Sequence, residues 1–206
     1  RRLFSSLKSI FVFDFRLENK RRLKAKMEFR NIVFKLSNHF KIEIFQILDV
    51  GGIISGGALL TAFLDGNILE DQDLDIYCNK EKSEAVKQNL IGQGCSLTKT
   101  TPLNVDPHYA GSSFYEITDF ATKEGRKIQV IVYNTEITGI IMAFDFSFCM
   151  NFLSRHEFWS FRPELTLAKR GYRVNFTDKS KMVEREEKYK DRGFKIGRFE
   201  IEYFDE

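Results

Sequence analysis

Apolar residues recur with helical spacing along the first part of the chain. This spacing matches the period of about 3.6 residues that lines up one face of a helix. The first members of the pattern are Phe4, Leu7, Ile10 and Phe11. We therefore predict one or two amphipathic helices over residues 1–38, which form an arm in front of a domain over residues 39–206.

The predicted arm carries basic residues as well as an apolar stripe. Its basic cluster consists of Lys20, Arg21, Arg22 and Lys24. These side chains fit a solvated helix face, and they also fit contacts with phosphates. The apolar stripe needs a cover, either from the chain's own domain or from a neighbouring protein on which the arm would dock.

A different pattern begins at residue 50. Residues 50–55 form a short apolar run that ends in small side chains, which indicates a buried strand, and Gly56-Gly57 then opens a helix-forming stretch. Further on, apolar residues alternate with Asp73 and Asp75. Because side chains alternate between the two faces of a strand, we expect a strand here with both carboxylates on one face.

The second half of the chain mixes strand and helix patterns. Two β-rich runs, 114–120 and 126–133, flank a Thr-Lys-Glu-Gly turn, which is typical of a hairpin. The other expected elements are helices over 82–90, 138–143 and 178–190, and strands over 144–148 and 194–204. A buried helix is the alternative for residues 144–148. Together the patterns predict an α+β fold with a mixed or antiparallel sheet flanked by helices.

The composition is that of an ordinary soluble globular protein, with 43% hydrophobic and 30% charged residues in a chain of 206. The 21 phenylalanines, against 3 prolines, indicate a substantial core and few disordered linkers. A net charge of +3 is too small to argue for nucleic-acid binding by itself.

Cysteine usage and the absence of long apolar runs bear on location. The 3 cysteines have no CxxC spacing, which favours a reducing, intracellular compartment over a disulfide scaffold or a zinc site. No run approaches the roughly 18 apolar residues of a membrane span. The basic, Ser-rich start is similar to a mitochondrial presequence, but Asp14 and Glu18 interrupt that pattern. We expect the cytoplasm, or a virion or other large complex.

Two features of the segment from residue 50 to residue 76 suggest a chemical function. Asp73 and Asp75 on one strand face would repel each other unless a cation neutralises them, and carboxylate oxygens suit Mg²⁺. A strand that runs into Gly56-Gly57 and then a helix presents free backbone N–H groups and the positive end of the helix dipole, where a phosphate can bind. A metal site and a phosphate site on consecutive elements suit attack on a nucleoside triphosphate (NTP).

Two sequence blocks together resemble a known signature. Ile54-Ser55-Gly56-Gly57 followed by Asp73-Leu74-Asp75-Ile76 resembles the motif of the DNA polymerase β-like nucleotidyltransferase superfamily. Residues 144–149 and 188–194 resemble a branch of it in large DNA viruses and some eukaryotes. The resemblance implies two Mg²⁺ ions held at Asp73 and Asp75, and nucleotidyl transfer from an NTP to a hydroxyl. The acceptor stays open among RNA, a protein, a nucleotide and a small molecule.

The third carboxylate is where this chain departs from the superfamily. Active members normally carry it on a strand beside the Asp-x-Asp strand, where it helps to activate the attacking hydroxyl. Here Gln129 occupies that place, and an amide can neither bridge two metals nor accept a proton at neutral pH. Asp145 is the alternative third acid, although it also fits an acid at a strand edge. Glu116 and Asp119 are further candidates.

Basic residues near the end of the chain and one hydroxyl complete the candidate site. Arg185, Lys188 and Arg192 recur at i, i+3 and i+7 on one helix face, from which they could hold a triphosphate or an RNA backbone. Interleaved glutamates also fit an ion-paired, solvated helix. The Ser55 hydroxyl could bind a phosphate, or its small side chain could serve only the turn.

Two functions follow as competing hypotheses. The first is Mg²⁺-dependent nucleotidyl transfer, with Asp73, Asp75 and Asp145 as the catalytic carboxylates. The second is a catalytically reduced nucleotidyltransferase fold that serves as a structural component of a virion or ribonucleoprotein, which Gln129 and the arm favour. The hypotheses differ in whether three carboxylates converge beside the Gly-Gly turn.

Overall fold

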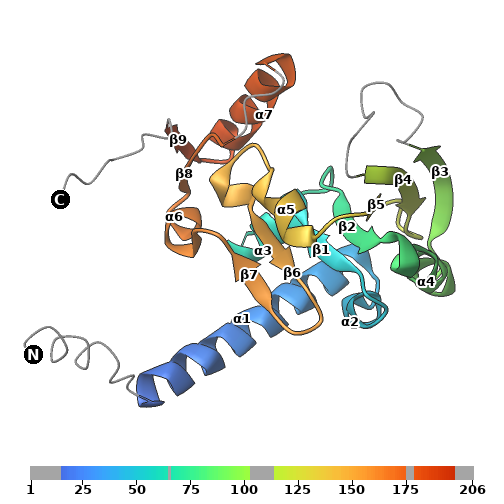
Figure 1. Cartoon of the computed structure of the whole chain (residues 1–206), viewed down its shortest axis with the longest axis horizontal. Coiled ribbons are helices and arrows are strands. Elements are labelled where there is room, and N and C mark those ends of the chain that lie inside the picture. The colour runs from blue at the N-terminus through green and yellow to red at the C-terminus, as the bar shows by residue number, and fades with distance from the viewer. Residues whose placement is uncertain (1–14, 65, 103–113, 175–178, 198–206) are drawn as a thin grey trace, which may run out of the picture.

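A seven-stranded mixed sheet forms the centre of the molecule (Figure 1). The computed structural model describes residues 15–64, 66–102, 114–174 and 179–197. The strands lie in the order β3-β4-β5-β2-β1-β6-β7, and β2 and β5 are the parallel pair. Their bounds are β1 Ile53–Ser55, β2 Leu74–Asn79, β3 Ser96–Pro102, β4 Phe114–Ala121, β5 Lys127–Tyr133, β6 Asn151–Leu153 and β7 Phe158–Ser160.

Four helices cover one face of this sheet and enclose the main core. They are α1 (Phe15–Phe40), α2 (Ile44–Asp49), α3 (Gly56–Phe63) and α4 (Lys80–Gly92). Side chains from all four helices join the core side chains of the sheet in a single buried cluster. The two-residue period of the strands decides which residues meet the helices, namely Leu74 and Ile76 on β2 and Ile128 and Val130 on β5.

The opposite face of the sheet is covered only in part. Tyr77 of β2 and Ile131 of β5 point to this side, where they pack with Ile140 of helix α5 (Ile137–Met142). Asp75 and Gln129 have the same parity on their strands and therefore share this face. The sheet thus separates an apolar core from a polar surface that carries the residues of interest.

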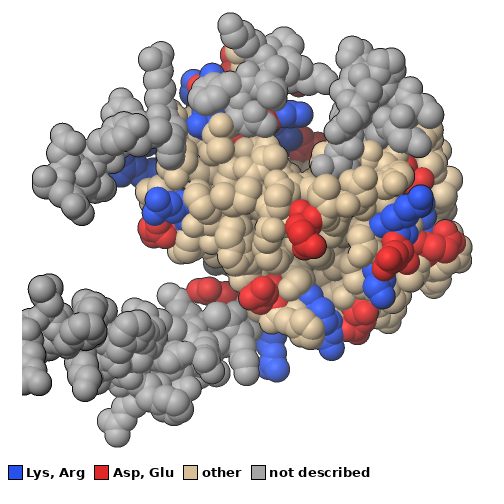
Figure 2. Space-filling view, viewed as in Figure 1, with Lys and Arg blue, Asp and Glu red and all other residues tan. Residues whose placement is uncertain are grey.

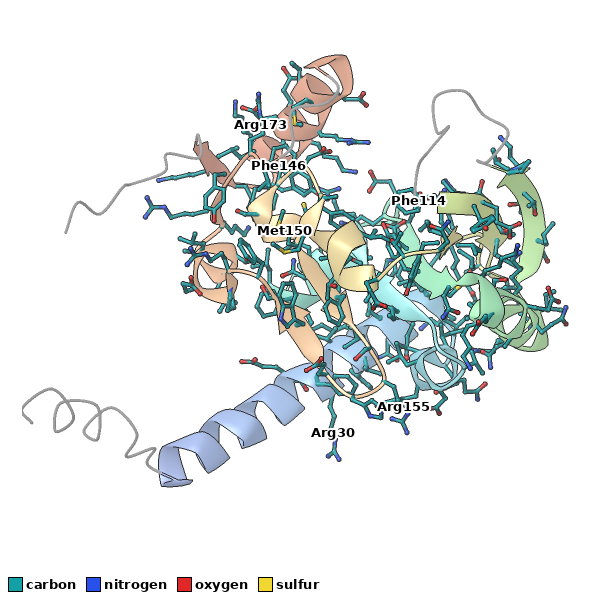
Figure 3. The ribbon with its side chains drawn as sticks, in the orientation of Figure 1. Arg30, Phe114, Phe146, Met150, Arg155 and Arg173 are labelled. Carbon is teal, nitrogen blue, oxygen red and sulfur yellow. The ribbon has the colours of Figure 1, made fainter. Side chains whose placement is uncertain are left out.

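The C-terminal helix α7 (Lys179–Asp191) is fixed above this second face by an aromatic cluster. Phe148 lies in the short 3-10 helix η2 (Ser147–Cys149), and its ring centroid lies 4.9 Å from that of Tyr189 on α7. An ion pair between Arg173 and Glu186 adds a polar anchor. Figure 3 shows Phe146 and Arg173 lying under α7. Nearby are α6 (Pro163–Leu167) and a parallel pair of strands, β8 (Arg170–Tyr172) and β9 (Lys195–Gly197).

The predicted hairpin is confirmed, whereas the strand predicted over residues 144–148 is wrong. β4 and β5 pair in antiparallel fashion on either side of the Thr-Lys-Glu-Gly turn. Residues 147–149 instead form a buried 3-10 helix, which agrees in part with the alternative of a buried helix, and Phe146 makes an isolated bridge to Arg173. Phe146 and Phe148 pack against Tyr189 of α7, and they do not belong to a regular strand. Of the strand predicted over 194–204, the structure shows β9, and residues 198–204 lie outside the described part.

The helix predicted near the start of the chain exists and runs into the core. The last turns of α1 bury Val33, Leu36 and Phe40, while its first half projects away from the sheet (Figure 1). The boundary at residue 38 stays a prediction, and residues 1–14 lie outside the described part. Among the described helices, none is long and apolar enough to cross a membrane.

Candidate functional site

Most of the residues singled out from the sequence meet in one cavity. It has a volume of about 850 Å³, which lies within the range of roughly 300–1,000 Å³ typical of small-molecule sites. Phe114 and Phe146 line it from opposite sides of the space below α7 (Figure 3), and Lys and Arg side chains gather around α7 (Figure 2). Its predicted site residues are Gly56, Gly57, Asp73, Asp75, Asp145, Arg185 and Lys188.

Two carboxylates enter the cavity from β2 and the residue before it. Asp75 lies on β2 and Asp73 directly precedes it, while Leu74 and Ile76 are fully buried on the other face. Burial and, to a smaller extent, the charge of Asp73 raise the pKa of Asp75 to about 7, against the smaller opposing effects of Lys127 and Lys188. The site therefore disfavours a second negative charge unless a cation is added.

Gly56 allows the carboxylate of Asp75 to lie against the start of α3. Its backbone has a φ of +82°, a conformation that favours glycine. A Cβ at this position would overlap the carboxylate of Asp75. The Gly-Gly turn and the acidic strand are therefore in direct contact.

The structure does not place the Ser55 hydroxyl in the cavity. Ser55 is fully buried, and its Oγ donates to the carbonyl oxygen of Asn151 on the neighbouring strand β6. The side chain makes no capping hydrogen bond to α3. The predicted phosphate contact through this hydroxyl is therefore replaced by a link between strands, and the first N–H groups of α3 remain without a side-chain cap from Ser55.

Gln72 positions the acidic segment, and sequence reasoning missed it. Its amide nitrogen donates to the carbonyl oxygen of Gly57 at 3.2 Å and to the Thr61 hydroxyl at 3.0 Å. Its amide oxygen accepts from the N–H of Leu69 at 2.9 Å. The side chain thereby ties the residue before Asp73 to helix α3. A single glutamine between two acids gives no pattern from which these contacts could have been found.

Lys127 is a second residue that the sequence analysis overlooked. Its Nζ lies 3.1 Å from a carboxylate oxygen of Asp73 and 3.8 Å from one of Asp119. The side chain is about half exposed, so these ion pairs are weak and exchangeable. Lys127 stands two residues before Gln129 on β5, and the period of two could have placed it on the same face.

A glutamine, and not a third carboxylate, lies beside Asp75 on the neighbouring strand β5, as the sequence indicates. Gln129 lies opposite Asp75 in the parallel register, and its amide nitrogen donates to Asp119 at 2.7 Å. Among the described residues, no three His, Cys, Asp or Glu side chains come together so as to hold a metal ion. Asp145 lines the same cavity, but its carboxylate pairs with Arg185. The structure therefore does not group Asp145 with Asp73 and Asp75.

Helix α7 and the residue that follows it bring three cations to the cavity from a distant part of the sequence. They are Arg185, Lys188 and Arg192, which line it as the i, i+3, i+7 spacing predicts. Glu186 lies between two of these cations in the sequence. Its carboxylate forms ion pairs with Arg173 and Lys190, which do not line the cavity. Lys188 acts on Asp75, whose pKa it lowers. The cavity thus combines two acids at its sheet side with cations at its helix side.

Comparison with known proteins gives the fold. No protein-family model matches the chain, and no curated protein does. Among solved structures, the Thermotoga maritima CCA-adding enzyme complexed with tRNA matches 75% of this chain with a TM-score of 0.55 and 16% identity. A CCA-adding enzyme in complex with ATP matches the same share with a TM-score of 0.53 and 19% identity.

CCA-adding enzymes are members of the nucleotidyltransferase superfamily. This chain has a nucleotidyltransferase-type fold. A third CCA-adding enzyme structure, an apo form, agrees with a TM-score of 0.53 and 16% identity. The match covers only 38–39% of the length of these three enzymes. The likeness therefore establishes the nucleotidyltransferase-type fold of this domain and goes no further.

Proposed function

We propose that this domain transfers a nucleotidyl group from an NTP to a hydroxyl acceptor, with Mg²⁺ held by Asp73 and Asp75. The observation that carries the proposal is the cavity itself, which joins the Gly56-Gly57 helix start, the carboxylate pair and the cations of α7. The fold supports the same class of reaction, because similar structures are CCA-adding enzymes in complex with CTP and with ATP.

The residues present fit a magnesium ion that binds together with the substrate. Proteins commonly hold Mg²⁺ with one or two carboxylates plus the phosphates of the substrate. Asp73 and Asp75 supply two carboxylates, and because burial and the charge of Asp73 raise the pKa of Asp75, a bound cation would stabilise its ionised form. When bound, the ion would neutralise charge that develops on the phosphates during transfer.

The remaining parts of the NTP have matching surfaces in the cavity. The N–H groups at the start of α3 would receive phosphate oxygens, because the helix dipole is positive at that end. Lys188 would face the phosphates from the other side. Tyr77, Ile140 and Phe144 pack together and also line the cavity, where they would contact a nucleobase.

The reaction follows from these contacts. An oxygen of the acceptor forms a bond to the α-phosphorus, the bond from that phosphorus to the bridging oxygen breaks, and pyrophosphate leaves with the electron pair. The proton of the acceptor hydroxyl passes to solvent water, since Gln129 cannot accept it. RNA is the acceptor class we favour, because a similar structure is complexed with tRNA.

Purified protein should incorporate label from α-labelled NTPs into an added RNA acceptor in the presence of Mg²⁺. Asp73→Asn should lower this incorporation by about a hundredfold or more, because it removes one of two proposed metal ligands. The matched control is Asp191→Asn, which makes the same change at an exposed residue at the end of α7. No incorporation by the wild type, or equal incorporation by Asp73→Asn, would refute the proposal.

Lys188→Gln should raise the KM for the NTP by about tenfold or more, while kcat changes less. A hydrogen bond from a charged group contributes about 1.5–3 kcal/mol to binding, and Lys188 is proposed to contact phosphates before the reaction. Lys190→Gln is the control, because Lys190 lies on the same helix but pairs with Glu186. A loss of kcat alone would contradict the proposed binding role.

Gln129 favours a second function, the catalytically reduced fold. In that case the cavity would bind an NTP without transferring it, and the domain would act as a component of a larger complex. The N-terminal helix would then dock on a neighbouring protein. Tight binding of a non-hydrolysable NTP analogue, together with no incorporation into any acceptor, would select this function.

A further inference from the structure

A second hollow lies beside the loop that leads to Asp73. It has a volume of about 520 Å³, and the end of α1, the residue before β5 and part of the loop between α3 and β2 surround it. Its lining side chains include Phe34, Lys35, Asn38, His39, Lys41 and Arg126. None of the residues that line it within the described part of the chain is acidic. The hollow is therefore a basic surface, distinct from the cavity of the proposed transfer.

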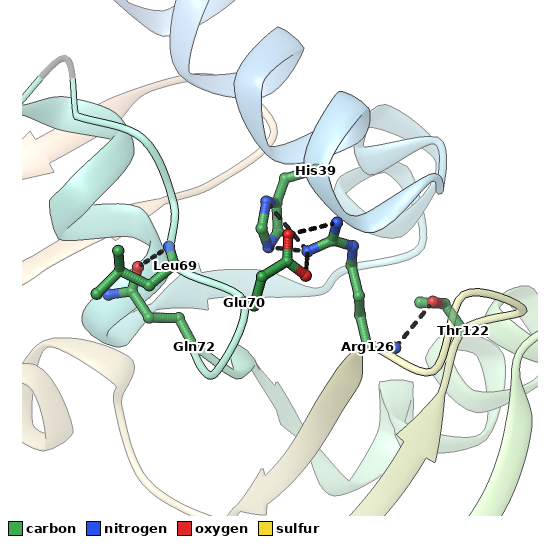
Figure 4. Close-up of polar contacts among 6 residues, drawn as sticks. All are labelled: His39, Leu69, Glu70, Gln72, Thr122 and Arg126. Atoms are coloured by element: carbon green, nitrogen blue, oxygen red, sulfur yellow. Dashed lines mark hydrogen bonds and ion pairs between the residues drawn. The ribbon is translucent and has the colours of Figure 1, made fainter.

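Arg126 contacts His39 and Glu70 at this hollow (Figure 4). Its guanidinium lies 2.7 Å from Nε2 of His39, which accepts the hydrogen bond. Burial and the neighbouring Arg126 both lower the pKa of His39, so the imidazole is neutral at pH 7. Arg126 Nε is buried and has no hydrogen-bond partner in the described part of the chain. The guanidinium is thus held in place by His39 through one of its terminal nitrogens.

Glu70 is the acid that competes for this guanidinium. Its carboxylate oxygens lie 2.8 Å and 3.1 Å from the two terminal nitrogens of Arg126 (Figure 4). The Glu70 side chain is 83% exposed, so the pair contributes little and the carboxylate can move into solvent. A phosphate could take its place on Arg126 with the same paired geometry.

Phe34 gives the hollow an aromatic surface. Its side chain is 67% exposed, although the neighbouring apolar side chains of α1, Val33 and Leu36, are buried. An exposed aromatic ring among cations is the combination by which proteins bind single-stranded nucleic acid, where bases stack on rings and basic side chains follow the backbone. A free phosphate would use the cations but would gain nothing from Phe34.

We infer that this hollow binds a single-stranded nucleic acid, with Lys35, Lys41 and Arg126 on its backbone phosphates and Phe34 stacked on a base. The inference goes beyond the proposed transfer, because it concerns a separate site and needs neither an NTP nor Mg²⁺. It also gives the domain a means of holding an acceptor strand outside the cavity.

The test measures binding of a fluorescein-labelled single-stranded oligo(U) RNA by fluorescence anisotropy, in EDTA and without NTP. Lys35→Gln with Lys41→Gln should weaken binding about tenfold. It should also lower the slope of log affinity against log salt by about 1.4, because each of the two lysines neutralises one phosphate and each phosphate contributes about 0.7. The matched control is Lys82→Gln with Lys99→Gln, two exposed lysines on α4 and β3. Thermal unfolding followed by circular dichroism should show that both double variants are folded.

Two single variants test the other parts of the inference. Phe34→Ala should weaken binding about fivefold or more with an unchanged salt slope, because stacking is not ionic. Glu70→Gln should strengthen binding severalfold, because it removes the competing carboxylate. Because the binding assay contains neither NTP nor Mg²⁺, a failed transfer assay would leave its result unaffected.

Three outcomes would overturn the inference. The first is a double lysine variant that binds RNA as its lysine control does. The second is a Phe34→Ala variant with unchanged affinity. The third is inorganic phosphate that displaces the RNA at concentrations near the RNA dissociation constant, which would assign the hollow to a free anion.

Discussion

Replacing Asp75 with asparagine should lower the rate of nucleotidyl transfer by about a thousandfold or more. The same change should stabilise the metal-free protein at pH 8. The first effect follows from the proposed loss of a metal ligand, which removes several kcal/mol of charge stabilisation from the transition state. The second follows from the position of Asp75, whose pKa is raised to about 7 by burial and by Asp73. Function and stability thus oppose each other at this residue.

The sign of the stability effect depends on pH. The unfolded carboxyl has a pKa near 3.8, so between pH 4 and pH 7 the folded protein binds more protons than the unfolded chain. The folded protein therefore loses stability as pH rises through this range, and the full penalty is present above pH 7. Asparagine has no charge to bury, so Asp75→Asn should be more stable by about 2–4 kcal/mol at pH 8 and nearly equal at pH 4.

Urea unfolding in EDTA at pH 4, 6 and 8 measures this difference. Asp191→Asn, which makes the same change at an exposed carboxylate, serves as the control. Addition of Mg²⁺ with an NTP at pH 8 should stabilise the wild type more than Asp75→Asn. A difference between Asp75→Asn and wild type that is the same at all three pH values would contradict the assigned pKa.

Gly56→Ala should destabilise the fold by about 2–3 kcal/mol and lower transfer by about a hundredfold. The positive φ of Gly56 costs an L-residue about 1–2 kcal/mol, and the added Cβ overlaps the Asp75 carboxylate, which must move. Displacement of that carboxylate removes it from the proposed metal site. Urea unfolding and kcat/KM for the NTP measure the two effects.

Gly57→Ala is the matched control for stability. A Cβ at Gly57 would lie 3.4 Å from the Gln72 amide nitrogen and 3.7 Å from an Arg192 guanidinium nitrogen, which are ordinary contacts. Because alanine favours a helix more than glycine does, this variant should be as stable as the wild type or slightly more so. Equal destabilisation by the two substitutions would show that the overlap with Asp75 is not the cause.

The local part of the site could be predicted from the sequence. Alternation over residues 73–76 placed two carboxylates on one face and two apolar residues in the core, because the period of a strand is short and strict. The glycine pair at the start of α3 and the cations at helical spacing on α7 follow from equally local rules. The carboxylates, the glycines and these cations all line the cavity.

Contacts between distant segments could not be predicted in the same way. The Ser55 hydroxyl donates to Asn151, which is 96 residues further along the chain, and no local pattern indicates such a partner. The phenylalanines at 144, 146 and 148 alternate as in a strand, yet Phe146 and Phe148 pack against Tyr189 of α7. The short strands β6 and β7 have only three residues each and were missed for lack of a pattern.

The outermost strand on one side of the sheet, β3, has a consequence for the behaviour of the protein in concentrated solution. An edge strand presents unpaired backbone groups to which a second chain can add. β3 is mostly polar, has Lys99 in its middle and Pro102 at its end, and shifts register against β4 between Leu97 and Lys99. Charge, proline and an irregular register each oppose the addition of another strand, so this edge resists aggregation.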